Sequence, residues 1–406
     1  MKTIFNSLIC LLTVIILAGN SGKTNAQDNR ITIGIIDTVY SEILKEKRSI
    51  WVYIPNNSKG FYASQKYPVV YLLDGEAHFY SVMALIQQLS EVNMNMVLPQ
   101  MIVVGIQNTD RTRDLTPTHA SSDPDVPDST FLRTSGGGEN FTSFIEKELI
   151  PYIESKYSAD QYRILIGHSW GGLFCLNTLL NHTKLFQGYI AIDPSLKWDN
   201  YSVLKQAEQL LSEKDFKGTS LFLSIANSGY SDTETKKDNA PAFKLSKYLD
   251  DNRNNNLRYT WRYYKDDNHG SVPMISEYDG LRFLLDFYNP RLPYDKFRDP
   301  AYNVDSFIVS HYNKVSSSMG YTIHPPESLM NWLGYLFIME KQYDKAHTLL
   351  KRNVDNYPDS PNVYDSMGEI LLLEGDTTRA LDNYERSLKI NPGNENAGNL
   401  VKRLKR

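Results

Sequence analysis

Short apolar runs alternate with helical segments between residues 67 and 290. The runs cover residues 68–73, 101–106, 163–166, 188–192, 220–225 and 259–264. Runs that are apolar throughout are typical of strands covered on both faces, as in a parallel sheet between layers of helices. Residues 31–36 and 49–54 instead alternate with polar positions, which predicts antiparallel strands. The pattern therefore predicts an α/β fold with a mostly parallel sheet.

The last part of the chain repeats at an interval of 34 residues. This interval separates Gly334 from Gly368, Ala346 from Ala380 and Pro358 from Pro392. Small residues let paired helices approach closely, and a proline ends the second helix of each unit. The spacing resembles the tetratricopeptide repeat, a helix–turn–helix unit. We expect these repeats at residues 326–400, after a linker at residues 291–325. Two alternatives are left open: either a degenerate repeat unit lies near residues 301–319, or the two clear units pack on the preceding domain.

The amino terminus has the pattern of a secretory signal peptide. Lys2 precedes an apolar run over residues 4–17, and small and polar residues follow as far as Ala26. The alternative is an uncleaved membrane anchor. The run is shorter than the ~20 residues that a spanning helix needs, which favours the signal peptide. We expect a signal peptide at residues 1–26 and an exported protein, periplasmic or secreted, without stable membrane insertion.

Composition and charge exclude several classes of protein. The chain has 406 residues, of which 41% are hydrophobic and 22% charged, which is ordinary globular usage. A net charge of −4 gives no electrostatic case for binding nucleic acid. Two cysteines exclude a disulfide framework, and the histidines show no metal-ligand spacing such as H-E-x-x-H. We therefore expect neither a metal nor a cofactor.

A G-x-S-x-G motif, GHSWG at residues 167–171, follows one predicted buried strand and precedes an apolar helix at 173–180. In this context the serine lies on a sharp strand-to-helix turn that exposes its hydroxyl. Ser169 is therefore the predicted nucleophile, whereas His168 points elsewhere in such a turn and has a structural role. The alternative is a glycine-rich turn with a solvated serine.

A serine hydroxyl needs a base, and in this fold class the base is a histidine after the last core strand. His269 follows the strand predicted at residues 259–264 and is the predicted base. The acid that orients it is left open. Asp267, two residues before the histidine, and Asp232, after the strand at 220–225, are nearly equal candidates. In the same loop Glu234 is the next choice after Asp232, and Asp193 is a distant third candidate.

The oxyanion formed during acyl transfer needs two backbone N–H donors. One is the amide of Trp170, directly after the nucleophile, and the other belongs to the loop after the third strand. That loop begins Asp74-Gly75-Glu76, so Gly75 or Glu76 supplies the second donor.

Several stretches together carry a family resemblance. They are YPVVYLLDG at residues 67–75, RTRDLTP at 111–117, GGG at 136–138, GHSWGG at 167–172, DPSLKW at 193–198 and HGSVP at 269–273. They resemble the α/β-hydrolase-fold esterases that include siderophore trilactone esterases, S-formylglutathione hydrolases, feruloyl and acetyl-xylan esterases, and mycolyltransferases. The similarity covers residues 48–288 and implies ester hydrolysis, with Ser169 and His269 carried over. Relatives often have Glu where Asp267 stands.

The resemblance is strongest to the siderophore-esterase branch, through RTRDLTP and HGSVP. Lys197 and Trp198 depart from the paired tryptophans common there, which leaves the substrate open. We expect an exported serine esterase at residues 30–290, acting through an acyl-enzyme on a small-molecule or glycan ester such as a trilactone siderophore. The repeats offer a surface for a protein partner. The alternatives are a carbohydrate esterase, an acyltransferase, or a catalytically idle binding module.

Overall fold

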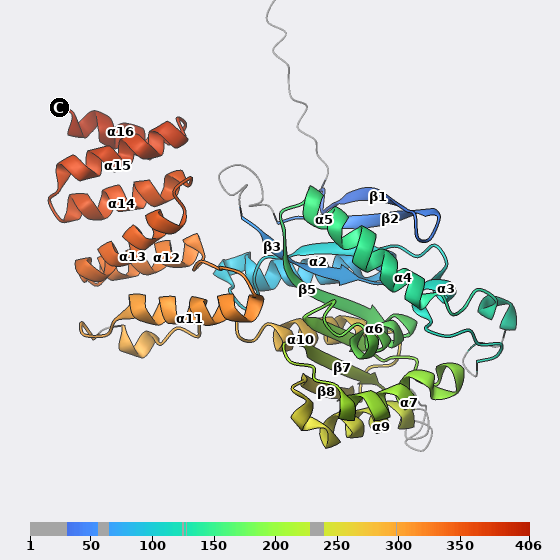
Figure 1. The fold of residues 1–406 in the computed structure, drawn as a ribbon. Coiled ribbons are helices and arrows are strands. Elements are labelled where there is room, and N and C mark those ends of the chain that lie inside the picture. Colours follow the sequence, from blue (N-terminus) through green and yellow to red (C-terminus); the bar gives the residue numbers. More distant parts are fainter. Residues whose placement is uncertain (1–30, 56–64, 124–125, 127, 228–238, 298) are drawn as a thin grey trace, which may run out of the picture. The chain divides into compact units, whose positions relative to one another are not determined.

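The computed structural model describes residues 31–55, 65–123, 126, 128–227, 239–297 and 299–406 (Figure 1). Their strands form one eight-stranded sheet in the order β1-β2-β4-β3-β5-β6-β7-β8. The pairs β1/β2 and β2/β4 are antiparallel, and all later pairs are parallel. The strands are β1 (Ile35–Ser41), β2 (Glu46–Tyr53), β3 (Tyr67–Leu72), β4 (Ile102–Ile106), β5 (Ala159–His168), β6 (Gly188–Ile192), β7 (Ser220–Ala226) and β8 (Arg258–Tyr264).

This architecture confirms the predicted α/β fold with a mostly parallel sheet. The predicted runs coincide with β2 to β8 within a few residues. Every residue of β3, β4 and β6 is buried, as expected for strands covered on both faces, whereas no residue of β8 is fully buried. The first strand differs: residues 31–36 were the expected strand, but β1 begins at Ile35. Ile36 on β1 is 72% exposed, so apolar side chains at this edge of the sheet do not mark the buried face.

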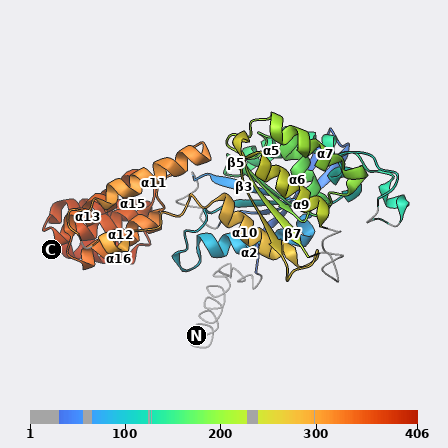
Figure 2. The ribbon, with the colours of Figure 1, turned by 90° about the horizontal axis from the view of Figure 1, so that it is seen from below.

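Helices cover both faces of the sheet (Figure 2). On one face lie α2 (Gly75–Ser90) and α10 (Val272–Leu284), which contact each other. The other face carries α4 (Gly138–Phe144), α5 (Ile150–Lys156), α6 (Trp170–Asn181), α7 (Trp198–Glu213) and α9 (Ala240–Asp251). Shorter helical segments are η3 (Val92–Met94), α3 (Arg111–Leu115), η4 (Ser129–Leu132), η5 (Ile145–Leu149), η6 (Arg253–Asn255) and η7 (Tyr294–Lys296).

The centre of α6 is among the most deeply buried parts of this core. Leu173 and Cys175 are fully buried, and burial raises the pKa of the Cys175 thiol well above its ordinary value. Cys175 is the one cysteine among the described residues. The helix that follows the predicted nucleophile is therefore anchored by apolar packing over most of its length.

The carboxy-terminal part is helical, and its helices recur at the predicted interval. It contains α11 (Val304–Met319), α12 (Glu327–Met339), α13 (Tyr343–Asn356), α14 (Pro361–Leu373), α15 (Thr377–Ile390) and α16 (Glu395–Leu404). Both ends of α14 lie 34 residues after those of α12, and both ends of α15 lie 34 after those of α13. A Cβ at Gly334 would lie 2.6 Å from Leu350, and one at Gly368 would lie 2.7 Å from Tyr384. The two glycines therefore allow equivalent close contacts between paired helices.

The segment predicted as a linker, residues 291–325, is not an open connection. It holds α11, at the place where the sequence left room for a further helical unit. Nε2 of His311 on α11 lies 2.9 Å from the carbonyl oxygen of Tyr288, and the rings of Tyr288 and Tyr312 meet edge to face. Tyr288 is 7% exposed. The helix α11 therefore covers the end of the segment that follows α10.

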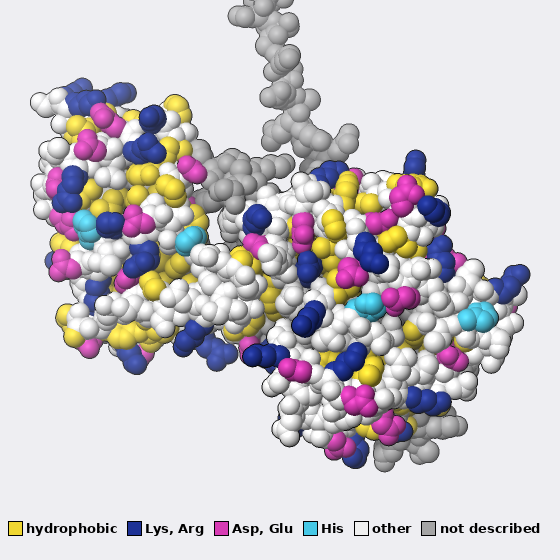
Figure 3. Space-filling model, viewed as in Figure 1, with side chains coloured by type: hydrophobic (Ala, Val, Ile, Leu, Met, Phe, Trp, Pro, Cys, Tyr) yellow, Lys and Arg dark blue, Asp and Glu magenta, His cyan; other side chains and the backbone are white. Residues whose placement is uncertain are grey.

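The predicted signal peptide, residues 1–26, lies outside the described residues. Within the described ranges, no helix combines the length and the apolar character needed to span a bilayer. On the face seen in Figure 3, basic and acidic side chains are interspersed over both the sheet domain and the helical part.

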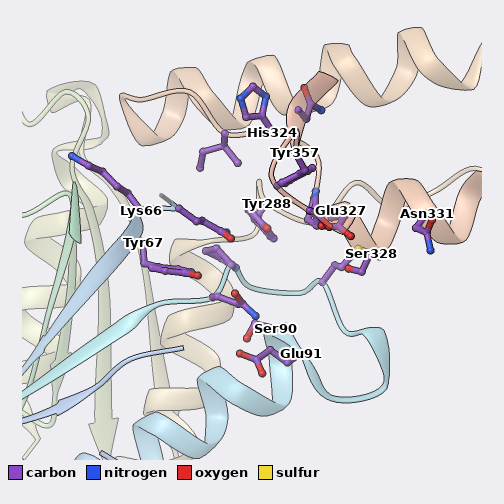
Figure 4. Close-up of a pocket in the computed structure, with 18 of the residues that line it drawn as sticks. Lys66, Tyr67, Ser90, Glu91, Tyr288, His324, Glu327, Ser328, Asn331 and Tyr357 are labelled. Carbon is purple, nitrogen blue, oxygen red and sulfur yellow. The ribbon is translucent and has the colours of Figure 1, made fainter. Parts of the chain in front are cut away.

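A cavity of about 1030 Å³ has none of the predicted catalytic residues in its wall (Figure 4). Its walls include Lys66 and Tyr67 at the start of β3, Glu91 after α2, and His324 and Glu327 before and on α12. Lys66 and Tyr67 place part of this cavity at the amino end of the parallel strand β3. The carboxyl ends, where α/β sheets hold their ligands, open into a different pocket.

Candidate active site

Ser169 occupies a strained turn between β5 and α6. Its φ and ψ angles are 61° and −118°, a backbone conformation that residues other than glycine rarely adopt. Its N–H donates to Ile192 at the end of the neighbouring strand β6. A Cβ on Gly167 would lie 2.4 Å from Gly171, so the chain can reverse this tightly only with glycine there. The predicted strand–turn–helix context of Ser169 is therefore present.

His269 is held by a carboxylate of β6. Its Nδ1 lies 2.6 Å from Oδ2 of Asp193, the residue that follows the strand. Asp193 is 11% exposed and has a φ of 39°, and its Oδ1 accepts from the N–H of Ala226 at the end of β7. A carboxylate can only accept, so Nδ1 of His269 carries the hydrogen and Nε2 is left to receive a proton.

The predicted acid Asp267 is not the residue that contacts His269 in the structure. Asp267 does not hold His269; its carboxylate accepts from the hydroxyl of Ser271 at 2.8 Å. Asp232 and Glu234 lie outside the described residues. Asp193, the third candidate, is the acid that the structure places against His269 because β6 is next to β5 in the sheet and the left-handed turn aims its side chain across the carboxyl edge.

The predicted oxyanion donors lie at the starts of two neighbouring helices. Trp170 is the first residue of α6, and Gly75 and Glu76 begin α2. N–H groups in the first turn of a helix have no partner within it, and the helix dipole favours negative charge there. A Cβ on Gly171 would lie 3.4 Å from the Asp74 carboxylate, so the two helix starts are close together.

An ion pair fixes the loop before α2. Arg111 makes two bonds to Asp74, with Nε–Oδ1 at 2.6 Å and Nη2–Oδ2 at 2.9 Å, and Asn108 adds a third at 2.7 Å. Burial raises the pKa of Asp74, but Arg111 and Asn108 outweigh it and hold the pKa below its ordinary value. The Arg111 guanidinium also lies over the ring of Trp170, 5.2 Å from its centre. Arg111 thus links both predicted oxyanion segments.

Ser169, Asp193 and His269 line one pocket of about 900 Å³. Trp170 and Arg111 are also part of its wall. Trp198 is not, because its ring is 1% exposed, meets Trp170 edge to face and donates through Nε1 to Thr118. Among the described residues no group of three or more His, Cys, Asp or Glu is arranged to hold a metal ion.

Two residues at the site had no role assigned from the sequence. Oγ of Ser195 lies 3.1 Å from Oγ of Ser169, and Arg111 bridges the helix starts. Arg111 belongs to the RTRDLTP stretch that carried the family resemblance, and Ser195 is two residues after Asp193. Their positions after predicted strands were signals of proximity to the site, since parallel strands end at one edge.

A serine on a strained turn after a central parallel strand, with an Asp–His pair from later strands, defines a serine hydrolase of the α/β-hydrolase class. The model of the "Putative esterase" family matches residues 41–258. Ferri-bacillibactin esterase BesA of Bacillus subtilis is 32% identical over 235 residues, which are 56% of this chain and 81% of that protein. The chain therefore belongs to this esterase family and is a carboxylic ester hydrolase.

Solved structures are similar over more of the chain. An IroE-like serine hydrolase from Shewanella oneidensis has a TM-score of 0.65 and 31% identity, covering 79% of this chain and 98% of that one. An uncharacterised protein from Capnocytophaga ochracea covers 92% of this chain and 99% of its own, with a TM-score of 0.59 and 17% identity. The second match concerns the fold alone, and its coverage includes most of the chain.

Proposed function

We propose that Ser169 is the nucleophile, His269 the general base and Asp193 the residue that orients it. The observation that carries this assignment is the bond between Asp193 and Nδ1 of His269, in the pocket that Ser169 also lines. Oγ of Ser169 attacks the ester carbonyl while Nε2 of His269 takes its proton. His269 then returns the proton to the leaving alcohol, which leaves an acyl-enzyme that water hydrolyses by the same steps.

The oxyanion of both steps is bound by the N–H of Trp170 and that of Gly75 or Glu76. Such fixed donors stabilise the transition state more than the ground state, so they contribute to turnover and not to substrate affinity. The Arg111–Asp74 pair supports this role, because it holds the start of α2 beside that of α6.

Labelling with a fluorophosphonate tests the assignment. The wild-type protein should be modified at Ser169, as located by mass spectrometry, and S169A and H269A should not react. A folded wild-type protein that stays unlabelled and inactive on esters would favour the idle binding module. Residual activity of S169A should be limited to that of the oxyanion donors and binding.

For the substrate, we propose a siderophore ester of the trilactone type. The support is the name of the relative, a ferri-bacillibactin esterase, and the IroE-like title of the similar structure. Among the described residues, the tryptophan ring in the wall of this pocket is that of Trp170, since Trp198 is buried. Turnover measured on a panel of trilactone, acetyl-sugar and aryl esters tests this substrate, and the trilactone should be hydrolysed fastest. Preference for an acetylated sugar would replace this substrate, and transfer to an added alcohol would indicate an acyltransferase.

We also propose that the protein is exported with cleavage after Ala26. Amino-terminal sequencing of protein from its native cell should start at Gln27 and find it outside the cytoplasm. Full-length protein in the cytoplasm would contradict this proposal.

The helices α12 to α15 form, in this proposal, two tetratricopeptide units that engage a partner or a large substrate. Their equal lengths and 34-residue offset support this, as do the paired glycine contacts. Because α11 covers Tyr288, a chain ending after Ile323 should remain soluble and turn over a small aryl ester normally, whereas one ending at Asn289 should be less stable. If the variant that ends after Ile323 folds but no longer hydrolyses a small aryl ester, the repeats must contribute to the active site.

A further inference from the structure

A row of ionisable side chains, partly buried at His168 and His78 and fully buried at Glu277, lies next to His269. The ring of His168 packs against that of His269 with 4.4 Å between centres, and the ring of His78 lies 5.8 Å from His168. Nδ1 of His78 is 3.3 Å from Oε1 of Glu277, whose side chain is 1% exposed. The mechanism above uses His269 alone among these four residues.

The row connects the three segments that carry the chemistry. His168 is the last residue of β5, directly before the nucleophile. His78 lies in the first turn of α2, the helix that begins with the oxyanion donors. Glu277 belongs to α10, which starts three residues after His269. A contact along this row therefore fixes the base relative to the nucleophile and the oxyanion donors.

The charges along the row are set by burial and by neighbours. A carboxylate as buried as Glu277 needs a cationic partner, and His78 faces it. Burial lowers the pKa of His78, but Glu277 and Asp74 outweigh this and the nearby Arg111, so that the pKa is above its ordinary value.

His168 responds in the opposite way. Its pKa is lowered to about 4, chiefly by burial and further by the imidazoles of His269 and His78, although Asp193 and Asp74 act against this. His168 is therefore neutral at neutral pH. A neutral ring does not repel the imidazolium that forms on His269 during each transfer.

His168 contacts His269 through ring packing and not through a hydrogen bond. Nε2 of His168 is buried and has no hydrogen-bond partner among the described residues. The ring face of His269 is thus supported by packing, while Asp193 fixes its tautomer from the edge. These two contacts constrain different rotations of the same imidazole.

We propose that His168 is a positioning residue for His269 and that the buried His78–Glu277 pair holds His168 in place. This proposal rests on the proposed role of His269 as base. It assigns to the residue before the nucleophile a part in turnover that acts through the base and not through the substrate.

The test compares H168F, which keeps a neutral ring, with H168N, which keeps a polar group without a ring. H168N should lower kcat on a small aryl ester by about tenfold to a hundredfold, the scale of a misplaced catalytic group, with little change in KM. H168F should stay within about fivefold of wild type, and labelling of Ser169 by fluorophosphonate should slow in parallel with kcat. H347A is the matched control, because it removes a histidine that contacts Glu374 in the helical part.

Turnover by H168N equal to wild type, or higher than that of H168F, would overturn the proposal, since a polar role would then be indicated. If a His168 variant does not fold by circular dichroism, E277Q decides, because it leaves His168 in place. E277Q should lower kcat several-fold at constant KM, and unchanged kcat would overturn the proposal. Failure of the wild type to label at Ser169 would instead refute the proposed function itself.

Discussion

Replacement of Asp193 by Asn changes the tautomer of the base without changing the shape of the site. The N–H of Ala226 donates to Oδ1 of Asp193 at 3.0 Å, so the oxygen of an Asn side chain is required at that position. The amide NH2 is then directed at Nδ1 of His269. Since NH2 can only donate, Nδ1 must accept, and the ring hydrogen moves to Nε2.

A histidine with its hydrogen on Nε2 cannot take the proton of Ser169. The loss expected for a wrong tautomer in an Asp–His–Ser triad is about 10⁴ in kcat. At about 1.36 kcal/mol for each factor of ten, this corresponds to about 5.4 kcal/mol of the activation barrier. The fold should persist, because the bond from Ala226 that ties the end of β7 to β6 is kept.

Initial rates on a small aryl ester measure this loss, with folded protein quantified by absorbance and circular dichroism, and labelling of Ser169 by fluorophosphonate should slow in parallel. D267N is the matched control: its amide oxygen can still accept from the hydroxyl of Ser271 and it leaves the contact between Asp193 and His269 unchanged, so it should stay within about threefold of wild type. D193N within tenfold of wild type, or D267N as slow as the loss predicted for D193N, would refute the assignment of the acid.

Three further changes have expected outcomes. G75A should destabilise the protein and abolish turnover, since a Cβ there would lie 2.6 Å from the backbone of Gly105; a soluble, fully active G75A in a thermal melt and ester assay would contradict the close approach. G368A should lower the free energy of unfolding by about 1–3 kcal/mol through crowding against Tyr384 and leave small-ester turnover unchanged, as denaturant titration and kinetics would measure. Because the folded-state pKa of His168 is about 4 and an exposed imidazole titrates near 6.5, only the unfolded chain binds that proton between these values. Acidification from pH 6.5 to 4 should therefore cost wild type more stability than H168F, and equal pH dependence would contradict the neutral state of His168.

The sheet was largely predictable because its central strands β3, β4 and β6 are buried along their whole length and therefore appear as continuous apolar runs. The places of Ser169 and His269 were predictable for a related reason: each has a fixed position relative to a strand, one in a glycine-rich turn and one after the last strand, and the structure has both residues at those positions. The beginning of β1 was not predictable, since an edge strand with exposed Ile36 carries no burial signal.

Which carboxylate contacts His269 depends on the direction of its side chain, and the sequence alone does not give this direction. Asp193, Asp232 and Asp267 all follow predicted strands, and proximity in sequence favoured Asp267. The choice depends on which side chain crosses the carboxyl edge of the sheet, which the φ of 39° at Asp193 decides. A polar residue directly after a fully buried strand, adjacent to the nucleophile strand, was the available signal. A helical unit at the place of α11 was one of two alternatives left open by the sequence, because this segment lacks the 34-residue pattern.

The burial of Cys175 makes this protein a convenient background for site-directed probes. Its thiol is fully buried in α6 and its raised pKa keeps it protonated, so maleimides should not reach or react with it under native conditions. Once residues 1–26 are removed, the chain contains no other cysteine. A spin label or fluorophore introduced on the helical part would then be the single reporter, without any need to alter the core beneath the nucleophile.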